Sequence, residues 1–374
     1  MQNFTTDNLM VAIDFGTSKI CGVVGKKDES GNVEIIAYAS DAPQGIKRGA
    51  VSNPEAAAHG LKRVLTCLQN NVITILNKGV PDDEKKSYEI TGVYVGLNAD
   101  KPDLKSNLQE CFKISKHKIN GIVLSPVATA SAVLSEDEKE KGCAIIDFGA
   151  GTTSAAIYHE KKLRYSCVIP LGSKLITNDI SDLSVPETTA ERLKINHGSA
   201  MEEMAENLHI PVPTEDEEEG ETVSTKLLAK IIETRIDEIL DYVCDKVEKS
   251  GFADRAKSVV ITGGGSQLHN LIEKLKQHLG LSVRIGIPNQ KTSSGMDKKY
   301  LKAEYAQLIG LLIHADESCI KEKVAVQQAP VVEKTPETEK KTAKNKWDNL
   351  FGTLFTDKEF AKEEPADKEN NNKK

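Results

Sequence analysis

The chain has 374 residues, 39% of them hydrophobic, and a net charge of −7 at pH 7. That length favours two domains, and the negative charge, without a basic stripe interleaved with aromatic residues, argues against nucleic acid as a partner. Seven cysteines without a C-x-x-C pair favour reduced thiols in a cytoplasmic protein. No apolar run reaches the roughly 18 residues of a membrane-spanning helix.

A strand-turn-strand unit is predicted first, in MVAIDFGTSKICGVVG. Its apolar run ends at Asp14, which places this carboxylate where a buried strand reaches the surface. Gly16 lets the backbone turn tightly, so the turn offers N–H groups and the hydroxyls of Thr17 and Ser18 to phosphate oxygens.

A helix is predicted over residues 54–70, followed by a strand in ITGVYVGLN, an amphipathic segment over 104–115 and a strand in GIVLS. Ser125 and Pro126 then form a helix start signal, in which Ser125 is interpreted as the N-cap.

The strand-turn-strand pattern returns as CAIIDFGAGTTSAAIY, where the apolar run ends at Asp147. The residues of this second turn are Gly149, Gly151, Thr152 and Thr153. One such turn alone is as typical of a purely structural turn as of a ligand-binding one. The pair indicates a nucleotide clamp because a third glycine signal, VVITGGGSQL, follows with Gly263, Gly264 and Gly265. Carboxylates cannot bind phosphate, but they suit a hydrated Mg²⁺, which prefers oxygen ligands.

Five more helices are predicted, near 174–181 and 186–197, over 225–250, in HNLIEKLKQHLG after the triple glycine, and over 303–314. The acidic run over residues 214–221 is interpreted as a solvated loop.

The C-terminal part changes character: residues 319–343 have the Lys/Glu/Pro-rich composition of a flexible linker, and 361–374 are predicted to be a disordered tail. Between them, a helix predicted over 344–360 would carry five apolar residues on one face. This stripe consists of Trp347, Leu350, Phe351, Leu354 and Phe355. It either docks on the rest of the chain or lies in a membrane surface. The aromatic residues and the lysines before them favour a membrane surface with anionic lipids.

With these motifs in this order, the chain resembles the actin, heat-shock chaperone and sugar-kinase superfamily, and within it the bacterial cell-division family FtsA. The stretches that carry the resemblance lie between about residues 9 and 315 and include VAIDFGTSKICGVVG, AIIDFGAGTTSAAIY, TTAERLKINHGSA and VVITGGGSQL. The resemblance implies an α/β fold with actin-like (ribonuclease H-like) duplicated domains flanking a nucleotide cleft. The first domain would comprise 8–137 and 303–318, and the second 142–302 with an inserted subdomain at about 183–255.

The resemblance implies ATP and Mg²⁺ as ligands, with the metal held through water by Asp14 and Asp147. Glu191 and Lys194 match the family's E-x-x-K, which borders ribose and adenine, although by spacing alone they are a surface ion pair. Lys19 would contact a phosphate, as a lysine of the first turn does in relatives, or remain solvated.

Two further positions concern hydrolysis and partner binding. Ser125 stands where superfamily members that hydrolyse ATP well often place a water-orienting Glu or Gln. Because serine is a poor base, we expect ATP binding with slow or absent hydrolysis. Arg235 matches the place where FtsA receives the acidic tail of the tubulin homologue FtsZ, whereas pattern alone makes it a solvated helix residue.

FtsA proteins carry an extra subdomain in the first domain, and here it is reduced to a few residues near 98–104. The family uses that subdomain in filament contacts and in contacts with later division proteins. A polymer of this chain would therefore rest on other faces.

The function implied is an ATP-binding scaffold that anchors the FtsZ ring to the inner face of the cytoplasmic membrane at the division septum. Its expected partners are the FtsZ tail, further copies of itself, anionic lipid and other division proteins. One alternative is an actin-like membrane adaptor of pilus assembly. Another is an ATP-dependent small-molecule kinase, which would need a carboxylate base and has no use for the C-terminal stripe.

Overall fold

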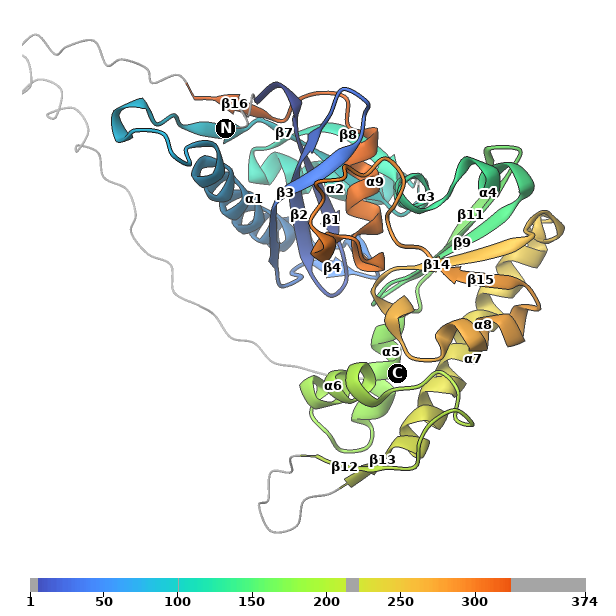
Figure 1. The fold of residues 1–374 in the computed structure, drawn as a ribbon. Helices are drawn as coiled ribbons and strands as arrows, with labels where there is room; N and C mark the ends of the chain where they lie inside the picture. The colour runs from blue at the N-terminus through green and yellow to red at the C-terminus, as the bar shows by residue number, and fades with distance from the viewer. Residues whose placement is uncertain (1–5, 100, 213–221, 324–374) are drawn as a thin grey trace, which may run out of the picture. The chain divides into compact units, whose positions relative to one another are not determined.

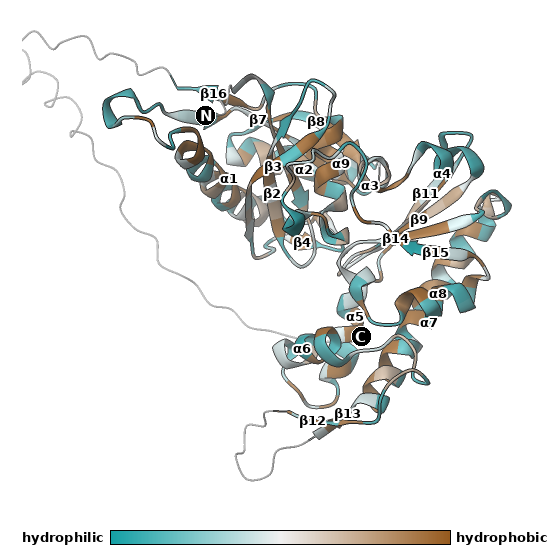
Figure 2. Ribbon diagram, in the orientation of Figure 1, coloured by the Kyte–Doolittle hydropathy of each residue, from teal (hydrophilic) through white to brown (hydrophobic). Residues whose placement is uncertain are grey.

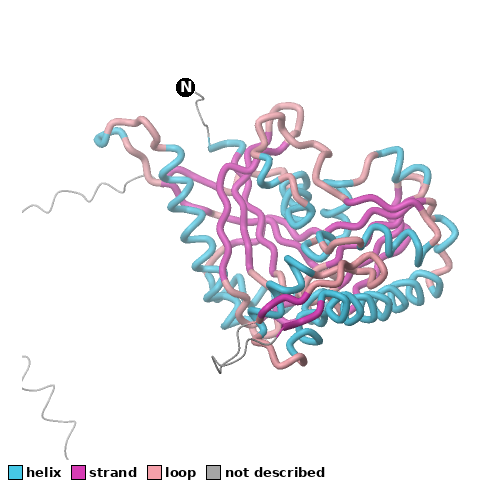
Figure 3. The backbone as a smooth tube through the Cα atoms, turned by 60° about the horizontal axis from the view of Figure 1, so that its bottom comes forward, coloured by secondary structure: helices cyan, strands magenta, loops and turns pink. Residues whose placement is uncertain are grey.

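The computed structural model describes residues 6–99, 101–212 and 222–323, and all of them belong to one compact unit. Two five-stranded sheets with helices packed on them make up most of this unit (Figures 1 and 3). The predicted limits of two domains remain predictions.

The first sheet has the order β3-β2-β1-β7-β8. Antiparallel pairing joins β1 (Leu9–Phe15) to β2 (Ile20–Lys27) and β2 to β3 (Val33–Asp41). On the other side of β1, β7 (Gly92–Leu97) and β8 (Lys118–Leu124) run parallel to it. The run LMVAI of β1 is wholly buried, as in strands that are covered on both faces.

The second sheet repeats this arrangement in the order β11-β10-β9-β14-β15. Its antiparallel strands are β9 (Cys143–Phe148), β10 (Thr153–His159) and β11 (Lys162–Ile169). Its parallel additions are β14 (Ser258–Thr262) and β15 (Ser282–Ile285). Asp14 is the last but one residue of β1, and Asp147 has the same place in β9. The predicted duplication is confirmed at the level of strand order and direction.

Helices connect and cover the strands. In the first half they are α1 (Pro54–Leu76), α2 (Pro102–Ser115), α3 (Ser125–Val133) and α4 (Glu136–Lys141). In the second half they are α5 (Ser173–Ser181), α6 (Glu187–His197), α7 (Thr225–Lys249), α8 (Leu271–Leu279) and α9 (Ala306–His314). α1 ends at Leu76, six residues later than predicted, because Val72 is also buried and extends the apolar face.

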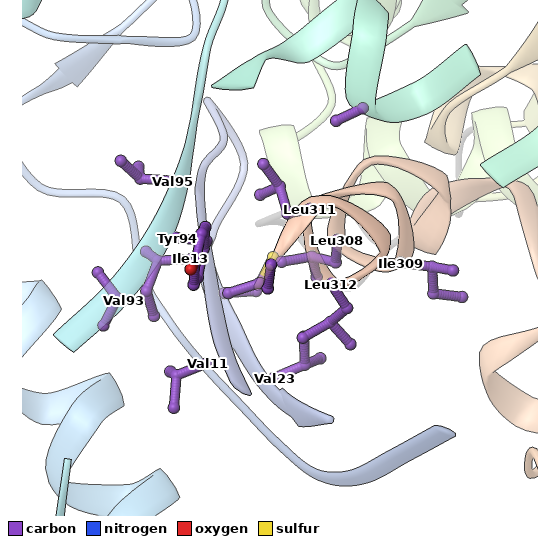
Figure 4. Close-up of a cluster of buried hydrophobic side chains, with 14 of the residues drawn as sticks. Val11, Ile13, Val23, Val93, Tyr94, Val95, Leu308, Ile309, Leu311 and Leu312 are labelled. Carbon is purple, nitrogen blue, oxygen red and sulfur yellow. The ribbon is translucent and has the colours of Figure 1, made fainter. Parts of the chain in front are cut away.

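α9 returns from the second half of the chain to the first sheet. Its Leu308, Leu311 and Leu312 are buried against strand residues such as Val11 and Val23 (Figure 4). Colouring by hydropathy shows β1, β2 and α9 as predominantly apolar (Figure 2). α9 also crosses α3, where a side chain on Gly310 would overlap the carbonyl oxygen of Ala128. A glycine is therefore needed for this close approach.

Three two-stranded ribbons complete the fold. They pair β4 (Ile46–Lys47) with β5 (Ala50–Val51), β12 (His209–Pro211) with β13 (Thr222–Ser224), and β6 (Tyr88–Ile90) with β16 (Ile320–Glu322). The last ribbon corrects the predicted linker, whose first residues form a paired strand. The apolar Ile320 is buried there against the first sheet, so a linker would start after Glu322.

No helix within the described ranges is long and apolar enough to cross a membrane. The acidic run over 214–221, the rest of the predicted linker, the apolar stripe and the tail lie outside the described residues.

Candidate functional site

A cavity of about 490 Å³ lies where the turns after β1 and β9 meet α5, α6, the glycine segment after β14 and the start of α9. Nearly all of the predicted nucleotide-binding residues line it. These are Asp14, Gly16, Thr17, Ser18, Lys19, Asp147, Gly149, Gly151, Thr152, Glu191, Lys194, Gly263, Gly264 and Gly265.

The two turns contact each other across this cavity. A Cβ on Gly151 of the second turn would overlap the side chain of Thr17 in the first. Within each turn, a Cβ on Gly16 or Gly149 would lie within 3 Å of a backbone carbonyl oxygen, that of Lys19 or Thr152. These glycines are therefore required by the tightness and the close approach of the turns.

Thr153 does not join the other turn residues. Its side chain is buried, and its hydroxyl donates to the carbonyl oxygen of Leu171 at 2.9 Å. The prediction that this hydroxyl faces a phosphate does not fit its placement, because the start of β10 turns the side chain into the protein.

Asp14 and Asp147 form a carboxylate pair at the base of the cavity. Burial, and then the charge of Asp147, raise the pKa of Asp14 to about 7, against the smaller opposing effects of Lys19 and a hydrogen bond from Gln307. Burial raises the pKa of Asp147 to about 6, opposed by a hydrogen bond from Thr129. Both residues are half-buried, and both side chains line the cavity.

Lys19 is held within the protein and is not simply solvated. Its Nζ lies 3.1 Å from a carboxylate oxygen of Glu304 and over the rings of Tyr38 and Tyr305. Burial lowers the pKa of Lys19, but the hydrogen bond and charge of Glu304 outweigh it, so the pKa rises overall. Lys19 therefore lines the cavity as a cation that already has a carboxylate partner.

Glu191 and Lys194 form more than a surface ion pair. The Nζ atom of Lys194 lies 2.8 Å from Glu191 and also donates to the Thr177 hydroxyl at 2.9 Å, and this lysine is buried. Thr177 in turn donates to Glu191. Burial lowers the pKa of Lys194, and the contact with Glu191 only partly offsets this. α5 and α6 are thereby joined along the cavity wall.

The glycine segment fits closely against the second turn. Gly263 has φ +85°, and a Cβ there would overlap the Asp147 carboxylate. Gly264 has no atom within 4 Å of the Cβ position, so its backbone faces open space. A flat ligand group can therefore lie against this backbone without meeting a side chain.

Ser125 does not line the cavity. It is 3% exposed, its Oγ atom has no hydrogen-bond partner among the described residues, and the structure gives it no capping bond. It is the first residue of α3 and not its N-cap, which is Leu124. The interpretation of Ser125 as N-cap is wrong, because its hydroxyl makes no bond to the first turn of the helix.

Arg235 lies on α7 and outside the cavity. Its guanidinium makes a two-pronged contact with Asp179 of α5, at 2.6 and 2.7 Å, and also contacts Glu238. The hydrogen bond and charge of Asp179 raise the pKa of Arg235. It is therefore an internally paired residue, and the interpretation as a solvated side chain is wrong.

The sequence patterns missed several lining residues. Glu304 comes from the turn that leads into α9 and Gln307 from the first turn of α9 itself, and the apolar wall contains Ile176, Ile195 and Leu268. No spacing in the sequence links these residues to the two turns. Only the return of α9 and the packing of α5 and α6 bring them to the cavity.

The residues present fit a cation held through water better than a directly ligated one. The described part of the chain holds no group of three or more His, Cys, Asp or Glu side chains arranged to bind a metal. Two like-charged carboxylates in one cavity nevertheless favour a nearby positive charge, which would relieve their repulsion.

Comparison with known proteins gives the following matches. The family model described as "Cell division protein FtsA" matches residues 144–310. FtsA of Pseudomonas aeruginosa is 25% identical over 380 residues, covering 84% of this chain and 91% of that protein. FtsA of Neisseria meningitidis is 28% identical over 369 residues, covering 80% and 88%.

Solved structures share the fold. MreB5 of Spiroplasma citri bound to ADP has a TM-score of 0.58 at 16% identity, covering 82% of this chain and 95% of that chain. A chain from the PilM–PilN type IV pilus biogenesis complex has a TM-score of 0.58 at 14% identity, covering 82% and 98%. The actin-like fold predicted from the sequence is confirmed.

Proposed function

Because this chain belongs to the FtsA family of cell-division proteins, within the actin-like superfamily, we propose that it is an ATP-binding scaffold that anchors FtsZ to the inner face of the cytoplasmic membrane at the septum. The observation that carries the proposal is the convergence of both aspartate turns and the triple glycine on one cavity.

In this proposal, the backbone and hydroxyls of the two turns bind the β- and γ-phosphates. The adenosine lies against Gly264 and the apolar wall, with Glu191 and Lys194 at the ribose. Asp14 and Asp147 hold hydrated Mg²⁺ through its water molecules. When bound, the metal would neutralise phosphate charge, and the two carboxylates would orient its water shell. MreB5 of Spiroplasma citri, which shares the fold, was solved with ADP.

Calorimetry with ATP and Mg²⁺ tests nucleotide binding. We expect the full-length protein to bind, and the double variant Asp14→Asn and Asp147→Asn to lose Mg²⁺-dependent affinity. No heat with the wild-type protein in the presence of magnesium would refute the proposal.

The proposed contact with the FtsZ tail must account for the ion pair of Arg235. An acidic tail would have to share Arg235 with Asp179 or displace it. Titration of FtsZ tail peptide should therefore show tighter binding to Asp179→Asn and loss of binding to Arg235→Glu. Lys230→Glu, a charge reversal at an exposed position of the same helix, is the matched control. Weaker binding of the peptide to Asp179→Asn would contradict the proposal that the tail binds Arg235 in place of Asp179.

The reduced extra subdomain is also part of the proposal. β7 ends at Leu97 and α2 begins at Pro102, which leaves four residues between them. The alignment with the Pseudomonas aeruginosa relative runs over 380 residues yet uses only 84% of this 374-residue chain. That relative therefore has several tens of residues without a counterpart here, which supports a shortened first domain. Self-association would use other surfaces.

A further inference from the structure

Among the residues of helix α9 (Ala306–His314), Gln307 alone lines the cavity. Its Nε2 atom donates to Oδ1 of Asp14 at 2.8 Å. Within the described residues, nothing donates a hydrogen bond to its carbonyl oxygen Oε1. This oxygen is also not one of their buried atoms that lack a partner. Oε1 is therefore accessible to water in the cavity.

The orientation of this amide follows from its neighbour. An ionised carboxylate only accepts hydrogen bonds, so the N–H side of the amide faces Asp14 and the carbonyl side faces away from it. Gln307 thus offers an acceptor oxygen, but no proton acceptor of useful basicity, next to the carboxylate pair.

A second observation lies behind Gln307. The Oγ atom of Ser125, on a residue that is 3% exposed, has no hydrogen-bond partner among the described residues. A Cβ placed on Gly96 would lie 3.0 Å from this Oγ and closer still to Nε2 of Gln307. The two polar atoms are therefore at most about 5.4 Å apart, so Ser125 lies directly behind the amide of Gln307.

The buried Oγ atom of Ser125 is closed to water, so Ser125 contacts the surroundings of Gln307 by packing and not through a water molecule. The N–H side of the amide is held by its hydrogen bond to Asp14 and lies close to Gly96 and Ser125. This arrangement leaves Oε1 on the side of the amide that faces away from Asp14.

From this geometry we propose that Gln307 orients the water that hydrolyses the terminal phosphoanhydride of the bound nucleotide, and that Ser125 positions Gln307 by packing behind its amide. The inference rests on the proposed function, since it requires a nucleotide in the cavity. The water oxygen bonds to the terminal phosphorus, whose bond to the bridging oxygen breaks. The electron pair leaves with the nucleoside diphosphate, and the water's proton goes to the released phosphate. Gln307 takes no proton, so turnover is slow.

The test is single-turnover hydrolysis of ATP by the full-length protein and Gln307→Met, which keeps length without the hydrogen bonds. We expect ATP affinity by calorimetry to stay within about threefold, and phosphate release to slow by on the order of tenfold or more. Gln109→Met, at an exposed position of α2, is the matched control and should change neither quantity.

A second variant, Ser125→Ala, keeps the test decisive if Gln307→Met does not fold. It should slow phosphate release less than Gln307→Met does, and its effect should vanish in the Gln307→Met background. Unchanged release by both variants, an equal loss in affinity and rate, or no release by wild-type protein above buffer would each overturn the inference. Failure of wild-type protein to bind ATP would instead refute the proposed function.

Discussion

Single residues in the cavity are arranged around two like charges. Asp14 and Asp147 face the same space, and each receives one hydrogen bond from a neutral side chain, Gln307 or Thr129. Lys19, the cation whose charge lowers the pKa of Asp14, is itself paired with Glu304. The protein therefore stores electrostatic repulsion that a bound cation would relieve.

Asp14→Asn should stabilise the nucleotide-free protein while removing Mg²⁺-dependent ATP binding. The folded-state pKa of Asp14, about 7, exceeds the ordinary value of 3.8, so its ionisation opposes folding. The stabilising effect of the variant is absent below pH 4, grows as the pH rises from about 4 to about 7, and stays constant above that. We expect about 1–3 kcal/mol at pH 8, measured by denaturant unfolding.

Asp254→Asn, at an exposed position, is the matched control and should leave stability unchanged. A loss of stability in Asp14→Asn at pH 8 would show that Asp14 supports the fold without a ligand.

Glu304→Gln should tighten ATP binding. The substitution releases Lys19 from its carboxylate partner and removes a negative charge near the phosphates. Because the pair is partly exposed, we expect a change of about threefold to tenfold in the ATP dissociation constant. Lys19→Met should reverse this gain, whereas Glu322→Gln, which removes the exposed pair with Lys86, should not alter affinity. Weaker ATP binding by Glu304→Gln would mean that Glu304 itself contacts the ligand.

At the scale of elements, the crossing of α3 and α9 supports the cavity from behind. α3 supplies Thr129 to Asp147 of the second sheet, and α9 supplies Gln307 to Asp14 of the first. The helices approach closely at Gly310 and Ala128. A change in the spacing of this crossing would therefore move both hydrogen-bond donors.

Gly310→Ala should destabilise the protein by about 1–3 kcal/mol, because the added methyl group overlaps the Ala128 carbonyl in a well-packed crossing. Thermal unfolding followed by circular dichroism measures this loss. Gly264→Ala, where the added group meets no atom within 4 Å, provides the comparison and should leave stability nearly unchanged. Equal unfolding temperatures of Gly310→Ala and the wild type would show that α3 and α9 can move apart at this crossing without a loss of stability.

At the scale of the whole molecule, one compact unit holds the cavity, and β16 ends it at Glu322. The predicted apolar stripe begins at Trp347, 25 residues after Glu322. If the residues between them form the flexible linker that the sequence predicts, several copies could attach to one surface, and many weak attachments would add up to strong binding.

Trp347→Glu combined with Phe351→Glu should therefore release the protein from anionic vesicles. The charges would remove the aromatic anchors from the proposed interfacial face and repel the lipid headgroups. Co-sedimentation with vesicles, with and without ATP and FtsZ, measures the effect. The tail substitution Asn370→Glu adds charge outside the stripe, and binding equal to that of the double variant would contradict the proposed anchor.

The sequence by itself determined the duplicated strand-turn-strand units, the triple glycine and most of the helices. These features are local: a buried strand needs an apolar run, and a tight turn needs glycine at fixed places. The positions of Asp14 and Asp147 at two strand ends followed from the same patterns, whereas the actin-like fold was implied by the resemblance to a known family.

Only the tertiary structure decided which groups meet. It paired Lys19 with Glu304 and Arg235 with Asp179, buried Ser125 and Thr153, and brought Gln307 to Asp14. These partners lie far apart in the sequence, and Lys19 and Glu304 are separated by 285 positions. Hydrogen bonds and ion pairs depend on distances of a few ångströms, which only the packing of α5, α7 and α9 against the sheets sets.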